Sequence, residues 1–160
     1  MSLLRQVDSV DRRLIEALRV NGRATFAELA RLVGLSAPAV HERVGKLEAA
    51  GIITGYHAAV TPAALGLGVS ALVGVLQGDR GDPDRIFAAL QEMPEIEDCW
   101  FVAGEETFVV KIRVPDMPSL ERAIGALNRI RGVARTRTTV ALSTRFEGRA
   151  RPAGDPAPVG

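Results

Sequence analysis

Residues 25–51 constrain the fold most, because they carry two short helical patterns separated by only a three-residue turn. The first pattern opens with a capping box, in which Thr25 and Glu28 satisfy amide groups left open in a first helical turn. Gly34 suits the end of that helix, and Ser36 can cap the next. Apolar residues at helical spacing predict the buried sides, Phe26, Leu29, Ala30 and Val33 in one helix and Val40, Val44 and Leu47 in the other. Two helices joined by a short turn that contains glycine are typical of a helix-turn-helix.

A preceding helix and a following wing complete a predicted N-terminal domain over residues 1–57. Asp8 can cap the first helix. Asn21 and Gly22 are predicted to end it, because both tolerate the left-handed conformation that a helix terminus often requires. Residues 52–57 alternate and turn like a short strand or wing. The domain is therefore expected to be a winged helix-turn-helix.

The face of the third helix opposite its buried stripe suits the major groove of DNA. Lys46 and Arg43 can reach phosphates or guanine edges, and Glu42 could accept a hydrogen bond from cytosine. The predicted contacts to double-stranded DNA are Ser36, Pro38, His41, Glu42, Arg43 and Lys46. The equal alternative for each of these residues is an ordinary solvent-exposed position on a three-helix unit. For Arg43, a role in packing or in an ion pair is equally consistent with the sequence.

The second half carries strand and helix patterns in the order β-α-β-β-α-β. The strand-like runs are residues 69–76, 96–103, 108–114 and 133–143, and the helical patterns begin at Pro83 and near Leu120. This order predicts a ferredoxin-like (ACT/RAM-like) domain over residues 69–143, an antiparallel sheet with both helices on one face. The fold class is therefore α+β.

The other face of that sheet carries Leu72 and Leu76. Leaving apolar area in water costs roughly 25 cal/mol per Å², so two such sheets are expected to pair and form a homodimer. Residues 58–68 are predicted to be the linker between the two domains. The proline- and glycine-rich residues 144–160 are predicted to be a flexible tail.

Charge and cysteine content limit the functional classes. The net charge is +1, so DNA binding must depend on local placement, and residues 1–57 hold eight Lys/Arg against six Asp/Glu. One cysteine and no leader-like opening favour a reducing cytoplasm, and no apolar run reaches the ~18 residues of a membrane span. Two histidines and Cys99 show neither metal-ligand spacing nor a nucleophile motif, so neither an enzyme nor a metal or cofactor site is expected.

Several ordered segments resemble the leucine-responsive/asparagine-regulator (Lrp/AsnC, or feast-famine) family. The resemblance covers roughly residues 8–143. Its segments are residues 11–15, Arg23, residues 28–30, 34–36, 43–44, 47–48, 51–56, 65–66, 132–133 and 136–138. It implies dimers built through the C-terminal sheets, often assembled into octamers.

The resemblance also implies a small-molecule effector, usually an amino acid, bound between dimers around the glycine-rich turn of residues 104–107. The family commonly has an aspartate where this chain has Thr107, and a carboxylate there can bind an ammonium group. Glu106 could supply that carboxylate instead. The predicted effector residues are Gly104, Glu106, Thr107, Met117, Thr136, Thr138 and Thr139. The alternative is that residues 104–107 form only a hairpin turn and the threonines only favour strand structure.

These patterns together predict a sequence-specific DNA-binding transcriptional regulator, modulated by an amino acid or similar effector. The alternative is an architectural protein that organises DNA without responding to a metabolite. Calorimetry with a panel of amino acids would discriminate between the two.

Overall fold

The computed structural model describes residues 7–148. They form two compact units, one of residues 7–59 with residues 146–148 and one spanning Val60–Arg145. Each unit has its own apolar core. No helix in the described range is long and apolar enough to cross a membrane. The same residues contain no cluster of metal-ligating side chains.

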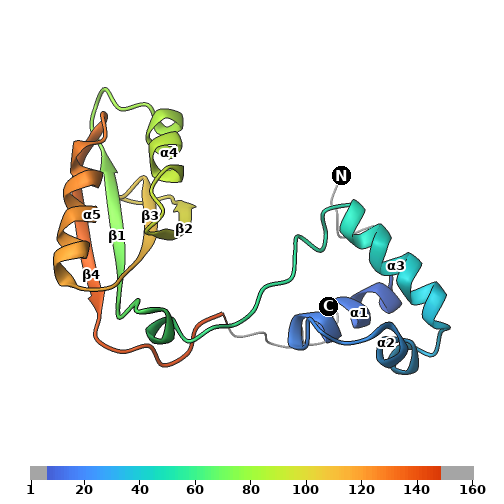
Figure 1. The fold of residues 1–160 in the computed structure, drawn as a ribbon. Helices are drawn as coiled ribbons and strands as arrows, with labels where there is room; N and C mark the ends of the chain where they lie inside the picture. Colours follow the sequence, from blue (N-terminus) through green and yellow to red (C-terminus); the bar gives the residue numbers. More distant parts are fainter. Residues whose placement is uncertain (1–6, 149–160) are drawn as a thin grey trace, which may run out of the picture. The chain divides into compact units, whose positions relative to one another are not determined.

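Three helices form the N-terminal unit: α1 (Ser9–Val20), α2 (Phe26–Val33) and α3 (Ala37–Ala49) (Figure 1). The Asp8, Thr25 and Ser36 side chains cap them as predicted, each accepting from a backbone amide three residues ahead. Gly34 has the left-handed conformation expected at the end of α2. The core contains the predicted Leu29, Ala30, Val40 and Val44, joined by Leu14 of α1.

The predicted end of α1 at Asn21 is confirmed, but the conformation predicted there and the predicted wing are wrong. Asn21 is extended, with its backbone N–H bonded to the Ala17 carbonyl, so no left-handed residue is needed there. Residues 52–57 form no strand. The amides of Ile52 and Ile53 instead donate to the carbonyl of Leu47 (2.9 and 3.1 Å), which closes the end of α3.

The C-terminal unit is a four-stranded antiparallel sheet in the order β2-β3-β1-β4. Its strands are β1 (Val69–Gln77), β2 (Ile96–Phe101), β3 (Phe108–Val114) and β4 (Val133–Ala141), and its helices are α4 (Pro83–Gln91) and α5 (Met117–Arg129). A short 3-10 helix, η2 (Pro62–Leu65), precedes β1 within the predicted linker. Strand order and connections confirm the ferredoxin-like fold (Figure 1). Two strands end earlier than expected, β2 at Phe101 and β4 at Ala141.

Both helices cover the same face of the sheet. One core cluster contains Val73 and Val110 from the strands, Ile86 and Leu90 from α4, and Leu127 from α5. Alternation along β1 turns Leu72 to the opposite face, where it is 49% exposed. Leu76, also expected on that face, is already buried within one chain at 7% exposure. Of the predicted tail, residues 149–160 lie outside the described range.

Candidate DNA-reading helix and effector site

The caps and the buried stripe of α3 determine which of its side chains face solvent. Ser36 Oγ accepts from the Ala39 amide at 3.4 Å, and proline occupies the first helical turn at Pro38. Val40, Val44 and Leu47 are buried at 4% exposure or less. The predicted reading residues Ser36, Pro38, His41, Glu42 and Lys46 are exposed.

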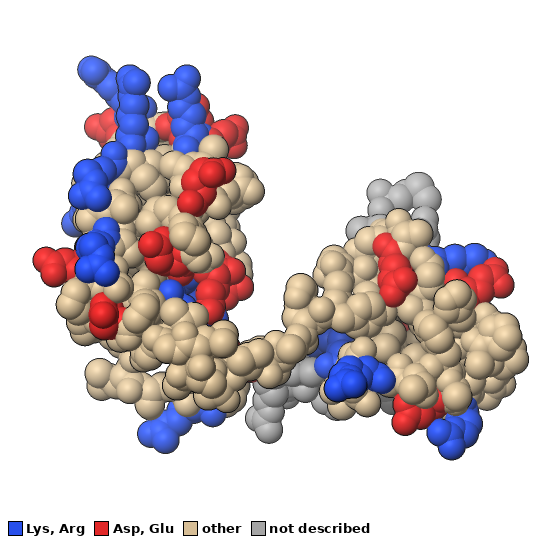
Figure 2. Space-filling model, in the orientation of Figure 1, with Lys and Arg blue, Asp and Glu red and all other residues tan. Residues whose placement is uncertain are grey.

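Lys46 and Glu42 are paired with each other one helical turn apart, with Lys46 Nζ 2.7 Å from Glu42 Oε1. This hydrogen bond lowers the pKa of Glu42. His41 makes an edge-on contact with the ring of Phe26, at 4.8 Å between centroids. In the face that Figure 2 shows, basic groups of this unit lie among acidic groups. The reading face is therefore a mixed surface rather than a basic patch.

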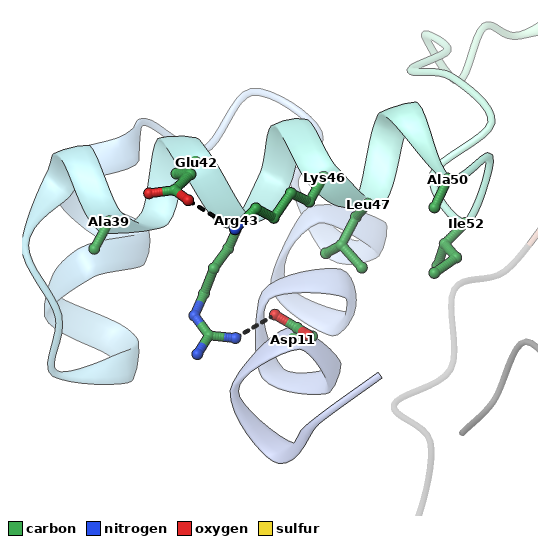
Figure 3. Close-up of a pocket in the computed structure, with 8 residues that line it drawn as sticks. All are labelled: Asp11, Ala39, Glu42, Arg43, Lys46, Leu47, Ala50 and Ile52. Carbon is green, nitrogen blue, oxygen red and sulfur yellow. Dashed lines mark hydrogen bonds and ion pairs between the residues drawn. The ribbon is translucent and has the colours of Figure 1, made fainter. Parts of the chain in front are cut away.

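Arg43 is directed toward α1. Its Nη1 lies 2.6 Å from Asp8 Oδ2 and 2.8 Å from Asp11 Oδ1. Figure 3 shows the side chain extending from α3 to Asp11. It borders a depression of about 430 Å³ whose other walls include Glu42, Lys46 and Ile52. Of the two roles predicted for Arg43, ion pairing is the one present in this structure.

Asp11 and Tyr56 contribute to this site and were missed in the sequence. Asp11 completes a second capping box with the predicted cap Asp8, which their three-residue spacing could have indicated, as that of Thr25 and Glu28 did. Tyr56 donates to Glu48 Oε1 at 2.8 Å and so joins the segment after α3 back to that helix.

The turn between β2 and β3 is tied to β1. The Thr107 amide donates to the Val75 carbonyl at 2.9 Å, and the Thr107 hydroxyl accepts from the Gln77 amide at 3.4 Å. The Val102 amide donates to the Thr107 carbonyl, which closes the hairpin. Gly104 is exposed at the tip. Thr107 is thus a structural part of the turn whether or not it also meets a ligand.

The carboxylates of this turn are neutralised by arginines of β4. Arg137 contacts Glu106 at 3.0 Å and Glu105 at 2.8 Å, and Arg135 also contacts Glu105. The hydrogen bond with Arg137 lowers the pKa of Glu105 and raises that of Arg137. Glu106 lies over Gly74 of β1, where an added Cβ would approach Glu106 Cγ to 2.6 Å. The glycine therefore provides the space that Glu106 occupies.

The remaining predicted effector residues do not gather at the turn within one chain. Thr136 donates to Asn128 of α5, so Thr136 and Thr138 belong to the helix-covered face and Thr139 to the open face. Met117 begins α5, three residues beyond the end of β3 at Val114, whereas the turn precedes the other end of that strand. The seven residues of β3 separate the two ends by roughly 20 Å.

An apolar cavity at the base of the turn was not predicted. It measures about 450 Å³ and lies between the start of α4 and the edge of the sheet. Phe108 forms its buried base, and Phe87 and the 71% exposed Phe101 flank it. The aromatic residues at both ends of the turn could have indicated it.

A helix-turn-helix unit followed by a ferredoxin-like unit defines a class of DNA-binding regulators. Comparison with known families agrees: the AsnC-type helix-turn-helix domain matches residues 7–48 and the Lrp/AsnC ligand binding domain matches residues 69–151. The chain belongs to the Lrp/AsnC family of helix-turn-helix transcriptional regulators.

Characterised relatives span nearly the whole chain. It is 42% identical to the HTH-type transcriptional regulator LrpA of Mycobacterium tuberculosis, over 89% of this chain and 95% of that protein. The leucine-responsive regulatory protein of Salmonella typhimurium is 37% identical over 86% of each chain. A solved structure of the feast or famine regulatory protein of M. tuberculosis, complexed with L-methionine, has a TM-score of 0.86 and 39% identity, covering 92% of this chain and 99% of that one.

Proposed function

We propose that this regulator reads double-stranded DNA with α3, using two helices of a homodimer in successive major grooves. The single observation that carries the proposal is the exposed face of α3 with His41, Glu42 and Lys46, mounted on a buried and capped three-helix core. Exposed Ser36 and Pro38 at the start of the helix join that face. Dimer symmetry would require a pseudo-palindromic site.

Dimerisation through the open sheet face follows from the apolar area exposed there. Leu72 and Trp100 are 49% and 47% exposed, and the registers of β1 with β3 and of β3 with β2 assign both to this face. Burying a residue of this size is worth about 1.5–3 kcal/mol, which favours pairing two sheets. Assembly into an octamer remains an expectation from the family resemblance.

The proposed effector is an amino acid held at the turn of residues 104–107. Glu106 can accept from the ammonium group and Arg137 can donate to the carboxylate, so a zwitterion could replace the ion pair that these two side chains make with each other. Gly104 leaves the turn open, and Thr107 fixes it on β1. Thr139, Thr136, Thr138 and Met117 would belong to the site only if subunits combine to form it. The L-methionine in the M. tuberculosis relative supports an amino-acid ligand.

One observation favours the alternative of an architectural DNA-binding protein. The carboxylates of the turn are already paired with Arg135 and Arg137, and Thr107 lacks the charge of the family's aspartate. A ligand must therefore displace existing ion pairs.

Two measurements test this function. Retention of duplex fragments should decrease steeply as salt rises, and calorimetry with a panel of amino acids beginning with L-methionine should show binding. DNA binding without heat from any amino acid would favour the architectural protein. A monomer without salt-sensitive retention of duplex DNA would contradict both functions.

A further inference from the structure

We propose that Arg43 is a positioning residue, which holds the reading helix against α1 and does not itself bind DNA. The inference rests on the proposed function of α3 as the DNA reader. Arg43 lies three residues before Lys46 on α3, at the border of the exposed face, and its side chain is 35% exposed. That location alone would suit a phosphate contact, so the partners of its guanidinium decide its role.

The guanidinium completes a network in which every carboxylate oxygen of Asp8 and Asp11 accepts a hydrogen bond. Asp8 Oδ1 accepts from the Asp11 amide at 2.8 Å, and Asp11 Oδ2 accepts from the Asp8 amide at 3.4 Å. The other two oxygens, Asp8 Oδ2 and Asp11 Oδ1, both accept from Arg43 Nη1. Arg43 therefore joins α3 to the capping box that begins α1.

The charges around Arg43 support the same positioning role. Asp8 and Asp11 place two negative charges within reach of one cation, and the Asp11 side chain is only 12% exposed. Both carboxylates belong to the start of α1, so without Arg43 the partly buried Asp11 loses its cation and α3 loses its ion pairs with α1. Moving Nη1 onto a phosphate would take the same cation away from both carboxylates.

The position of α3 determines how much of the protein is competent to bind. If loss of this connection leaves α3 correctly placed in a tenth of the molecules, the apparent affinity for DNA falls tenfold. The number of phosphates contacted by the correctly placed molecules does not change. A positioning residue therefore alters affinity without altering its salt dependence, whereas a phosphate contact alters both.

The acidic partner provides the sharpest test. If Arg43 bound phosphate, Asp11→Asn would remove one of the two carboxylates that hold the guanidinium away from the DNA, together with a negative charge near the DNA, so binding would tighten or stay the same. If Arg43 positions α3, Asp11→Asn should weaken binding much as Arg43→Gln does. The two hypotheses predict opposite signs for one substitution.

The experiment measures duplex affinity of the full chain against salt for Arg43→Gln, Asp11→Asn, the double variant and Arg43→Lys, with Lys46→Ala as the phosphate-contact comparison. We expect the affinity to fall about tenfold in Arg43→Gln and in Asp11→Asn, and the double variant to lose clearly less than the two single losses combined. The salt slopes should be unchanged, and Arg43→Lys should restore part of the affinity. A slope about one unit shallower in Arg43→Gln, or tighter binding by Asp11→Asn, would overturn the proposal.

Thermal unfolding of the same proteins keeps the inference testable apart from DNA. A double-mutant cycle between Arg43 and Asp11 should show a favourable coupling in the free energy of unfolding. Arg43→Lys should retain part of that coupling. Absence of coupling would refute the connection between α1 and α3 even if DNA binding is normal. Failure of the unmodified protein to retain DNA, with coupling intact, would instead refute the proposed function.

Discussion

Tyr56 donates a hydrogen bond of 2.8 Å to Glu48, so the segment that leaves α3 turns back and contacts that helix. A Cβ added at Gly22 would lie 3.5 Å from Tyr56 Cδ1, which places the ring beside the turn between α1 and α2. Burial and the neighbouring Glu48 raise the pKa of Tyr56 to about 12. The phenol therefore stays a neutral donor at physiological pH. Tyr56, together with Ile53 on the helical core, therefore holds this segment on the helices without a strand.

Tyr56→Phe should destabilise the N-terminal unit modestly. The variant keeps the ring over Gly22 and loses only the hydrogen bond, which is worth about 1 kcal/mol for a neutral donor of this kind. Tyr56→Ala loses the ring as well and should lower the free energy of unfolding further. Denaturant unfolding followed by helical circular dichroism measures both. Equal stability of Tyr56→Phe and the unmodified chain would show that the hydrogen bond is not maintained in solution.

The N-terminal unit should lose stability in acid. Hydrogen bonds from the Asp11 backbone and Arg43 lower the pKa of Asp8, and the Thr25 backbone and hydroxyl lower the pKa of Glu28. Each group therefore contributes stability that is present above its ordinary value of 3.8 or 4.5 and is lost as pH falls through the lower folded value. Thermal melts between pH 6 and pH 3 should show a decline that is shallower in the Asp8→Asn, Glu28→Gln double variant. An equally steep decline would assign the acid sensitivity to other carboxylates.

Sequence reasoning succeeded where a short stretch of chain determines the structure. The caps at Asp8, Thr25 and Ser36 involve partners three residues away, so their patterns are visible along the chain. The alternation of strands and helices was similarly sufficient for the ferredoxin-like order. The prediction of a wing was wrong for a physical reason. The backbone amides of Ile52 and Ile53 donate to the Leu47 carbonyl, and Ile53 packs on the helical core.

The site was less predictable because its partners are distant in sequence. Arg43 lies 32 and 35 residues from the two aspartates that bind it, and Arg137 lies 31 residues from Glu106. No local spacing indicates such pairs. The opposite faces of Thr138 and Thr139, by contrast, follow from the two-residue period of a strand and could have been predicted.

Lys46→Ala should weaken binding to every duplex and make the salt slope about one unit shallower, because one phosphate contact would be lost. Glu42→Gln is the matched control. It removes the carboxylate that holds Lys46 Nζ at 2.7 Å, which frees the ammonium group and should strengthen binding. Affinity measured from about 50 to 200 mM salt tests both variants. An unchanged slope in Lys46→Ala would remove Lys46 from the set of phosphate contacts.

Thr107→Asp should increase the affinity for amino acids. Aspartate can still accept from the Gln77 amide, as the threonine hydroxyl does at 3.4 Å, and it adds a carboxylate for an ammonium group. Calorimetry with L-methionine measures the change, with Thr107→Asn as the uncharged control. Glu106→Gln should have the opposite effect, because it removes the carboxylate proposed to bind the ligand. Equal binding heats for L-methionine in Thr107→Asp, Thr107→Asn and Glu106→Gln would show that the ligand does not bind at this turn.

Leu72→Glu should dissociate the dimer if the open sheet faces pair. Leu72 lies opposite Lys111 in the register of β1 and β3, so a carboxylate there is tolerated in a single chain but must lose water when two sheets meet. A symmetric interface contains the change twice, and at about 2 kcal/mol per leucine the dissociation constant should rise by several hundredfold.

Trp100 is the single tryptophan, and its partial exposure on the same face makes its emission a direct reporter. In the unmodified chain the emission should shift to shorter wavelength as protein concentration rises through the dissociation constant, and in Leu72→Glu it should stay unchanged. Leu65→Glu, on a leucine that is 65% exposed in η2 outside the sheet, is the matched control and should dimerise normally. Dimers of Leu72→Glu as strong as those of Leu65→Glu would mean that the subunits associate through another surface.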